Sequence, residues 1–122
     1  MKLFLKNSLF IALSLFSASS AIGDGIDYDT LADRCRTLSL QLDTLARTQD
    51  RETCASNLDG LNVYFAGNYI SLRWTNKAAE VLTSAIFQVE FAYDIGCYYQ
   101  DQIQNIIHDL KSVRNQLIDS RQ

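Results

Sequence analysis

The stretch that decides the fold of this chain is residues 78–117, AAEVLTSAIFQVEFAYDIGCYYQDQIQNIIHDLKSVRNQL. Its apolar residues recur at alternating steps of three and four, the spacing that places side chains along one face of an α-helix. The stripe comprises Leu82, Ala85, Val89, Ala92, Gly96, Tyr99, Ile103, Ile106, Leu110, Val113 and Leu117. This spacing predicts helix through most of the stretch.

Gly96 offers a break in the pattern. An uninterrupted helix of ~40 residues would be about 60 Å long, twice the length of the other predicted helices, and half of its stripe would be uncovered. Glycine is common where a helix ends. We therefore expect one helix before Gly96 and a second one after it.

The first predicted helix covers residues 29–47. Its apolar positions keep the same spacing and are Leu31, Cys35, Leu38, Leu42 and Leu45. We expect it to start at Asp29 or Thr30, because Thr30 and Asp33 form a capping pattern. Arg47 is a cation suited to the C-terminal end of a helix.

Residues 50–72 permit two interpretations. Asp50 can cap a helix whose apolar stripe would be Cys54, Leu58, Leu61, Phe65, Asn68 and Leu72. Alternatively, Val63–Ala66 and Tyr69–Leu72 are two strands of a hairpin around the turn-forming pair Gly67 and Asn68. The helix is favoured, since the stripe continues for six positions and an isolated hairpin would lack a partner strand. Thr75 or Asn76 would then cap the next helix.

These elements predict an all-α protein, an up-and-down four-helix bundle. The chain of 122 residues contains no proline to interrupt a helix, and 48% of its residues are hydrophobic, which excludes a disordered or collagen-like chain. The alternative is a helical hairpin plus one long helix that runs through Gly96 and dimerises.

Residues 1–21 have the pattern of a secretory signal peptide, and residues 22–122 are expected to form a single helical domain. Lys2 and Lys6 precede the apolar run 9–16, and small residues follow at 19–21. The run is too short to span a membrane, and we expect no transmembrane segment in the mature chain. The absence of an Asn-x-Ser/Thr site favours a bacterial protein, so we expect a periplasmic or extracellular location.

The charge of the mature chain argues against a nucleic-acid partner. Without Lys2 and Lys6, 11 basic residues become nine against 14 acidic ones, a formal charge of −5. Nucleic acids and anionic membranes are bound by clustered lysine and arginine. Here the mature chain has only Lys77 and Lys111, and its arginines are scattered.

Three cysteines in an exported chain predict a disulfide and one free thiol. If the second and third helices are antiparallel about a turn near residue 75, Cys54 and Cys97 are almost equally far from that turn. Cys35 lies about nine residues out of step with Cys54, or ~13 Å, which is beyond the reach of a disulfide. We predict the bridge Cys54–Cys97 with Cys35 free. The alternatives are three buried thiols, another pairing, or an intermolecular bridge through Cys35.

No recognisable catalytic or metal-ligating set is present in the sequence. The single histidine, His108, falls at an outward helical position, and no nucleophile has a defensible spacing to it. The acidic residues Asp24, Asp27, Asp29 and Asp33 are spaced loosely like calcium ligands, but the incoming helix and the bidentate glutamate of an EF-hand are missing. We expect no catalytic residue, metal site or cofactor.

The helix predicted before Gly96 carries more apolar residues than a bundle core requires. Ile86, Phe87, Phe91 and Tyr93 lie beyond its core stripe, and Tyr98 continues the row of Phe87 and Phe91 across Asp94. Either this second stripe packs on another helix of the chain, or Phe87, Phe91 and Tyr98 bind a partner or a second copy.

The sequence therefore favours an exported helical protein that acts by protein–protein contact and not by catalysis. An adaptor, an assembly component, an inhibitor and an immunity factor are the roles compatible with it. The alternative is a small-molecule or lipid carrier, in which aromatic residues line a cavity between the helices.

Overall fold

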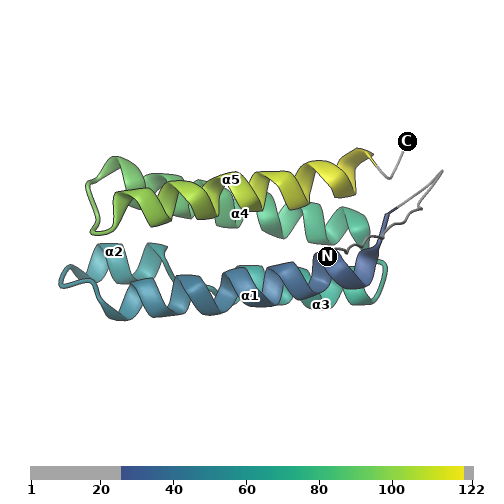
Figure 1. Cartoon of the computed structure of the whole chain (residues 1–122), viewed down its shortest axis with the longest axis horizontal. Helices are drawn as coiled ribbons and strands as arrows, with labels where there is room; N and C mark the ends of the chain where they lie inside the picture. Colours follow the sequence, from purple (N-terminus) through teal and green to yellow (C-terminus); the bar gives the residue numbers. More distant parts are fainter. Residues whose placement is uncertain (1–25, 120–122) are drawn as a thin grey trace, which may run out of the picture.

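The computed structural model describes residues 26–119, and these residues form five α-helices and no strand (Figure 1). The helices are α1 (Tyr28–Arg47), α2 (Glu52–Asn57), α3 (Leu61–Ser71), α4 (Thr75–Asp94) and α5 (Gln100–Asp119). The four longer helices run up and down beside one another, and the short α2 lies at one end of them. The predicted all-α four-helix bundle is confirmed.

The helices pack in chain order around the bundle. α1 packs on α3, α3 on α4 and α4 on α5, whereas α1 and α5 meet only lightly. Figure 1 shows the resulting layers, with α1 and α3 in one and α4 and α5 in the other. The seam between α1 and α5 is therefore the loosest side of the bundle.

The core of the bundle is aliphatic. The predicted stripes of α1, α4 and α5 are buried, and they meet the buried residues of α3 in one cluster. No aromatic residue of the described chain belongs to the fully buried set, and all ten aromatic residues between 26 and 119 are at least partly exposed. Aromatic side chains usually contribute much of a core, so their position outside this one requires another explanation.

The predicted break at Gly96 is confirmed. α4 ends at Asp94, and Gly96 has a φ of 81°, the left-handed conformation that glycine adopts most readily. Tyr99 has a φ of 70° and completes the reversal. Gly96 and Tyr99 thus lie exposed in a loop and not on the core stripe. The alternative of one long helix through Gly96 is wrong.

The start of α1 differs from the prediction. The helix begins at Tyr28, and Asp27, not Thr30, is the N-cap. The carboxylate of Asp27 accepts hydrogen bonds from the backbone N–H of Thr30 at 3.1 Å and from its hydroxyl at 2.7 Å. These two bonds lower the pKa of Asp27, the side-chain bond most. A carboxylate three residues before Thr30 therefore replaces the expected hydroxyl cap.

Residues 50–72 are helical and not a β-hairpin, but they form two helices instead of one. The break lies at residues 58–60, where the backbone of Gly60 is held against α1. The Ser39 hydroxyl donates to the carbonyl of Gly60 at 2.9 Å, and the N–H of Gly60 donates to Asp43 at 3.0 Å. A Cβ at residue 60 would lie 2.3 Å from the Ser39 carbonyl oxygen, so only glycine fits this approach.

This break changes which face of α3 is buried. The buried residues are Val63, Ala66, Gly67 and Ile70. The predicted core positions Leu61, Phe65 and Leu72 are exposed instead, and Asn68 is half-buried. The prediction rests on one continuous helix from residue 50. Residues 58–60 are not helical, so the helical phase is not continuous and a different side of α3 faces the core. The apolar stripe assigned to the core is thus the outer face of α3.

Two predicted helix caps are also wrong. α2 begins at Glu52 with Arg51 as its N-cap, and Asp50 instead accepts a hydrogen bond from the Tyr98 hydroxyl. α4 begins at Thr75 with Trp74 as its N-cap, and neither of these N-caps makes a side-chain capping bond. Tertiary contacts, rather than local capping, therefore fix where these two helices start.

The predicted signal peptide (1–21) and Asp24 of the acidic cluster lie outside the described residues. Among the helices of residues 26–119, none has the length and apolar character needed to cross a bilayer.

Candidate interaction surface

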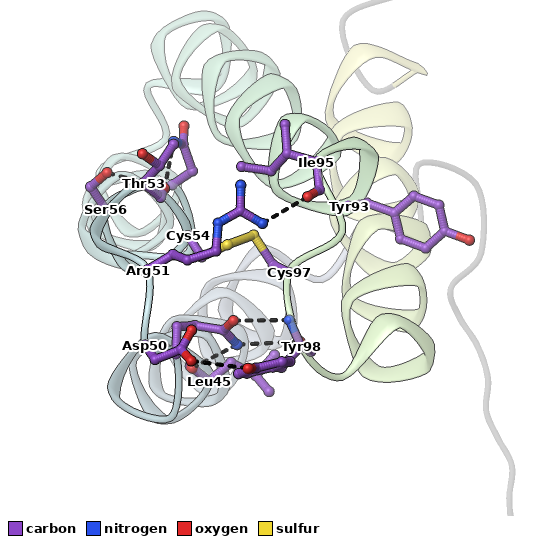
Figure 2. The surroundings of a disulfide bond; sticks show 12 residues. Leu45, Asp50, Arg51, Thr53, Cys54, Ser56, Tyr93, Ile95, Cys97 and Tyr98 are labelled. Atoms are coloured by element: carbon purple, nitrogen blue, oxygen red, sulfur yellow. Dashed lines mark hydrogen bonds between the residues drawn. A yellow bond between two sulfur atoms is a disulfide. The ribbon is translucent and has the colours of Figure 1, made fainter.

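One end of the bundle is closed by the disulfide between Cys54 and Cys97 (Figure 2). Its Cα atoms are 5.7 Å apart, so the predicted pairing is confirmed. The two cysteines meet because α2 and the loop after α4 lie at the same end of the bundle (Figure 1). The bridge ties the short α2 to the second half of the chain.

Hydrogen bonds reinforce this end (Figure 2). The Gln49 side chain accepts from the backbone N–H of Tyr98 at 2.9 Å and donates to its carbonyl at 3.2 Å. The Tyr98 hydroxyl donates to Asp50 at 3.0 Å, which raises the pKa of Tyr98. Arg51 donates to the carbonyl of Ile95 at 2.9 Å. The turn after α1 and the loop after α4 are thereby held together.

Tyr98 consequently does not extend the row of Phe87 and Phe91. The row is a property of α4, which ends at Asp94, and the chain reverses at Gly96 before it reaches Tyr98. Although half of its surface is exposed, Tyr98 is bound to the turn after α1. We assign it to the closed end of the bundle.

Cys35 is the free thiol, as predicted, and it is fully buried in α1. Burial raises the pKa of this thiol to about 12, because the thiolate would be poorly solvated there; the nearby guanidinium groups of Arg36 and Arg34 oppose the shift only partly. The thiol therefore stays protonated at neutral pH, and it lacks the exposure and thiolate character of a reactive cysteine.

Phe87 and Phe91 lie on the outer face of α4. Phe87 is 78% exposed and Phe91 is 48% exposed, so they do not pack on another helix of the described chain as core residues do. Ile86, which the sequence placed in the same second stripe, is buried, and Tyr93 is half-buried against the core. Of the apolar residues of α4 beyond its core stripe, only Phe87 and Phe91 are therefore exposed.

α3 adds an apolar face beside them. Leu61, Tyr64, Phe65 and Leu72 are all exposed, and the rings of Tyr64 and Phe65 lie 6.2 Å apart. No charged residue occurs anywhere in residues 60–72. A surface helix ordinarily presents charged or polar side chains to water, so this outer face of α3 is unusual for a solvated surface.

The helices that carry these two faces are neighbours. α3 packs directly on α4, and the Asn62 amide donates to Gln88 at 3.4 Å across their boundary. We call the combined surface the α3–α4 face. Its residues are Leu61, Tyr64, Phe65, Leu72, Phe87 and Phe91.

Most of the exposed large hydrophobic residues lie on the hairpin that α3 and α4 form together. Of the ten large hydrophobic residues that are exposed in the described chain, seven lie between Leu61 and Phe91; these are the six of the α3–α4 face and Trp74. With roughly 200 Å² for a fully exposed large side chain, the six residues of the face expose roughly 650 Å². The largest contiguous apolar patch of a typical monomeric protein measures ~300–600 Å², so the summed exposed area of these six residues is large for one pair of helices.

A shallow pocket lies at the edge of this surface, beside α2. It has a volume of about 310 Å³, and its lining includes Asn57, Phe87, Phe91 and Asp94. Recesses bordered by aromatic rings are the places where anchoring side chains of a partner bind most strongly.

The sequence contained a signal for the α3 half of this surface. The uncharged run 60–72 is unusual for a helix with one solvated side, but the spacing of its apolar residues also predicts a core stripe. Only the break at Gly60 shows which side of α3 faces outward.

A second pocket occupies the loose seam between α1 and α5. It has a volume of about 570 Å³ and is lined by Thr37, Leu40, Gln41, Thr44, Leu45, Gln102, Asn105, Ile106 and Asp109. None of these residues is aromatic. The aromatic-lined cavity that a carrier would need is therefore not found at this seam.

Metal-ligating residue types are not clustered in the described part of the chain. No group of three histidine, cysteine, aspartate or glutamate residues there could hold a metal ion. His108 lies on the outside of α5, as predicted, with its Nδ1 3.9 Å from the carboxylate of Asp109.

Neither protein-family models, nor curated proteins, nor solved structures yield a match to this chain. The fold and its exposed surfaces are thus the observations on which a function can rest.

Proposed function

We propose that this protein acts by protein–protein contact through the α3–α4 face and has no catalytic role. The observation that carries this proposal is the placement of the aromatic residues: the core is aliphatic, and five of the seven exposed rings of the described chain lie on the α3–α4 hairpin, whose residues 60–72 and 81–89 carry no charge. Aromatic residues are enriched, and charged residues depleted, at the centres of protein interfaces.

The size of the surface fits this proposal. A stable interface of ordinary size buries about 800 Å² on each partner. The roughly 650 Å² exposed by the six apolar residues supplies the central part of such an interface, and the polar residues around them would form its rim. An adaptor, an assembly component, an inhibitor or an immunity factor would use a surface of this kind.

We also propose that the protein is exported, to the periplasm or the outside of a bacterial cell. The disulfide supports this location, because disulfides form and persist in oxidising compartments. The signal-like pattern of residues 1–21 is the sequence feature behind the same proposal.

Site-specific photocrosslinking in the producing cell tests the contact surface. A photoreactive phenylalanine analogue at Phe87 is expected to give a discrete adduct of defined mass, because this ring would lie inside the interface. The same analogue at His108, which is equally exposed but lies on α5, is the matched control and is expected to give none.

Adducts of the same mass and yield from both positions, or none from Phe87, would contradict the proposed surface. An adduct specific to Phe87 counts for the proposal whether the captured chain is a different protein or a second copy.

A further inference from the structure

We infer that the partner bound by the α3–α4 face is a second copy of this chain, related by a two-fold axis that sets the two α3–α4 hairpins antiparallel. This inference rests on the proposed function and names the partner. It is carried by the distribution of charge along the hairpin, because a two-fold interface must be complementary to itself.

The hairpin is uncharged in the middle and charged at both ends. Residues 60–72 of α3 and 81–89 of α4 carry no charge. The only two cations between Asp59 and Asp94 are Arg73 and Lys77, which lie at the turn joining α3 to α4.

The opposite end of the hairpin is acidic. Asp59, Glu90 and Asp94 lie there, and Glu80 is the one acid placed near the cations. Glu90 is already paired with Lys111 of α5 at 2.9 Å, which leaves Asp59 and Asp94 as the exposed acids at this end. An antiparallel copy would bring its own Lys77 beside Asp94. Its Arg73 is already paired with Asp29 of α1 at 3.6 Å and lies over the ring of Tyr28, so the two Lys77–Asp94 pairs would supply most of the attraction.

A two-fold axis would have to pass midway between the basic and the acidic end of each helix, and the two midpoints lie at nearly the same height. On α4 the midpoint between Lys77 and Asp94 falls between residues 85 and 86. On α3 the midpoint between Asp59 and Arg73 falls at residue 66.

The hydrogen bond between Asn62 and Gln88 fixes the relative height of the two helices. Counted antiparallel from this bond, residue 66 of α3 is level with residue 84 of α4. The two midpoints therefore differ in height by only ~2 Å at 1.5 Å per residue. An axis at this height is level with Phe65 and about two residues, or ~3 Å, from the level of Phe87.

Charge neutrality at the centre also favours a second copy. The mature chain is expected to be acidic, so two copies repel each other unless they meet where neither carries charge. The α3–α4 face provides such a region, and the attractive pairs would lie at its two ends.

Charge reversal followed by sedimentation equilibrium of the purified chain tests this inference. Lys77→Glu and Asp94→Lys each replace two symmetric attractions by repulsions, so each is expected to raise the dimer Kd about tenfold at low salt. The double variant restores opposite charges across the axis, and its Kd is expected to return to within about threefold of the original.

These substitutions leave the fold of the single chain intact. Lys77 lies in the first turn of α4 and Asp94 is its last residue, so each reversal improves the interaction with the helix dipole. Lys77→Glu also removes an exposed pair with Glu80 at 3.6 Å, which is worth little at the surface. A loss of association would thus reflect the interface.

Three outcomes would overturn the inference. A double variant as weak as the single ones would exclude the antiparallel pairing. A chain that stays monomeric up to about 1 mM would exclude the second copy, while an adduct of a different protein at Phe87 would leave the proposed function standing. A dimer unaffected by Phe87→Ser would place the contact between copies on another surface and would contradict the inference.

Discussion

Replacing Cys54 and Cys97 by serine is expected to lower the free energy of unfolding by about 4 kcal/mol. The bridge closes a loop of 43 residues, and the chain-entropy relation for a loop of that length gives this value. A small domain has only about 5–15 kcal/mol of stability in total. At about 4–8 °C per kcal/mol, the melting temperature followed by circular dichroism should fall by about 15–30 °C.

Removal of the bridge should first affect the end of the bundle that contains α2. A helix of six residues is too short to be stable alone. Without the bridge, Gln49, Asp50 and Arg51 would hold this end only through exposed hydrogen bonds to the loop after α4.

The matched control for this experiment is Cys35→Ala, which removes a buried sulfur but leaves the bridge in place. It is expected to lose only about 1 kcal/mol, the usual cost of a small core truncation. A double serine variant that retains the stability of the original chain to within about 1 kcal/mol would contradict the role assigned to the bridge.

Gly60→Ala is expected to cost about 3–5 kcal/mol, which is large for the addition of one methyl group. The new Cβ would lie 2.3 Å from the Ser39 carbonyl oxygen and 2.9 Å from its carbon, and both are backbone atoms that cannot rotate away. α1 and the segment before α3 would have to separate. The bonds of Gly60 to Ser39 and Asp43 would then be strained or lost.

Gly67→Ala, inside α3, is the matched control. Its Cβ would lie 3.2 Å from the Ala32 carbonyl oxygen and 3.3 Å from the Cys35 Cβ, contacts that are tight but adjustable. A gain of about 1 kcal/mol in helix propensity offsets the crowding, so urea unfolding should change by less than about 1 kcal/mol. Equal losses from the two substitutions would refute the close approach of Gly60 to α1.

The sequence sufficed for the parts of the fold that depend on periodicity alone. The stripes of α1, α4 and α5, the break at Gly96 and the helical state of residues 61–71 all follow from spacing and from the conformational freedom of one glycine. The Cys54–Cys97 pairing followed because it requires only that both residues lie at the same end of the bundle.

Spacing could not reveal the rotation of α3. Leu61, Phe65 and Leu72 fit a continuous stripe from Cys54 as well as any core residues do, and they are more apolar than Ala66 and Gly67, which are buried in their place. The deciding interaction is the approach of Gly60 to Ser39, which joins residues 21 apart in the chain. A tertiary contact of this kind leaves no periodic signal.

The candidate surface could be predicted only in part, because only its α4 half follows from periodicity. Phe87 and Phe91 lie outside the core stripe of α4, so the sequence allows their exposure, but it also allows packing on another helix of the chain; the structure shows that they are exposed. The prediction for Tyr98 extends the row past the end of α4, where the chain reverses. The α3 half does not follow from spacing, because its apolar residues also fit a core stripe.

The central claim is that the exposed rings serve contact and not folding, and the melting temperature of the Phe87→Ser/Phe91→Ser variant at low protein concentration tests it most directly. Exposed substitutions usually change stability by under about 0.5 kcal/mol, so the variant should melt within about 5 °C of the original chain. At higher concentration only the original chain should gain stability, because association stabilises the folded state. If the rings belonged to the core, each truncation would cost about 3–5 kcal/mol, and a collapse of the melting temperature at every concentration would contradict the account.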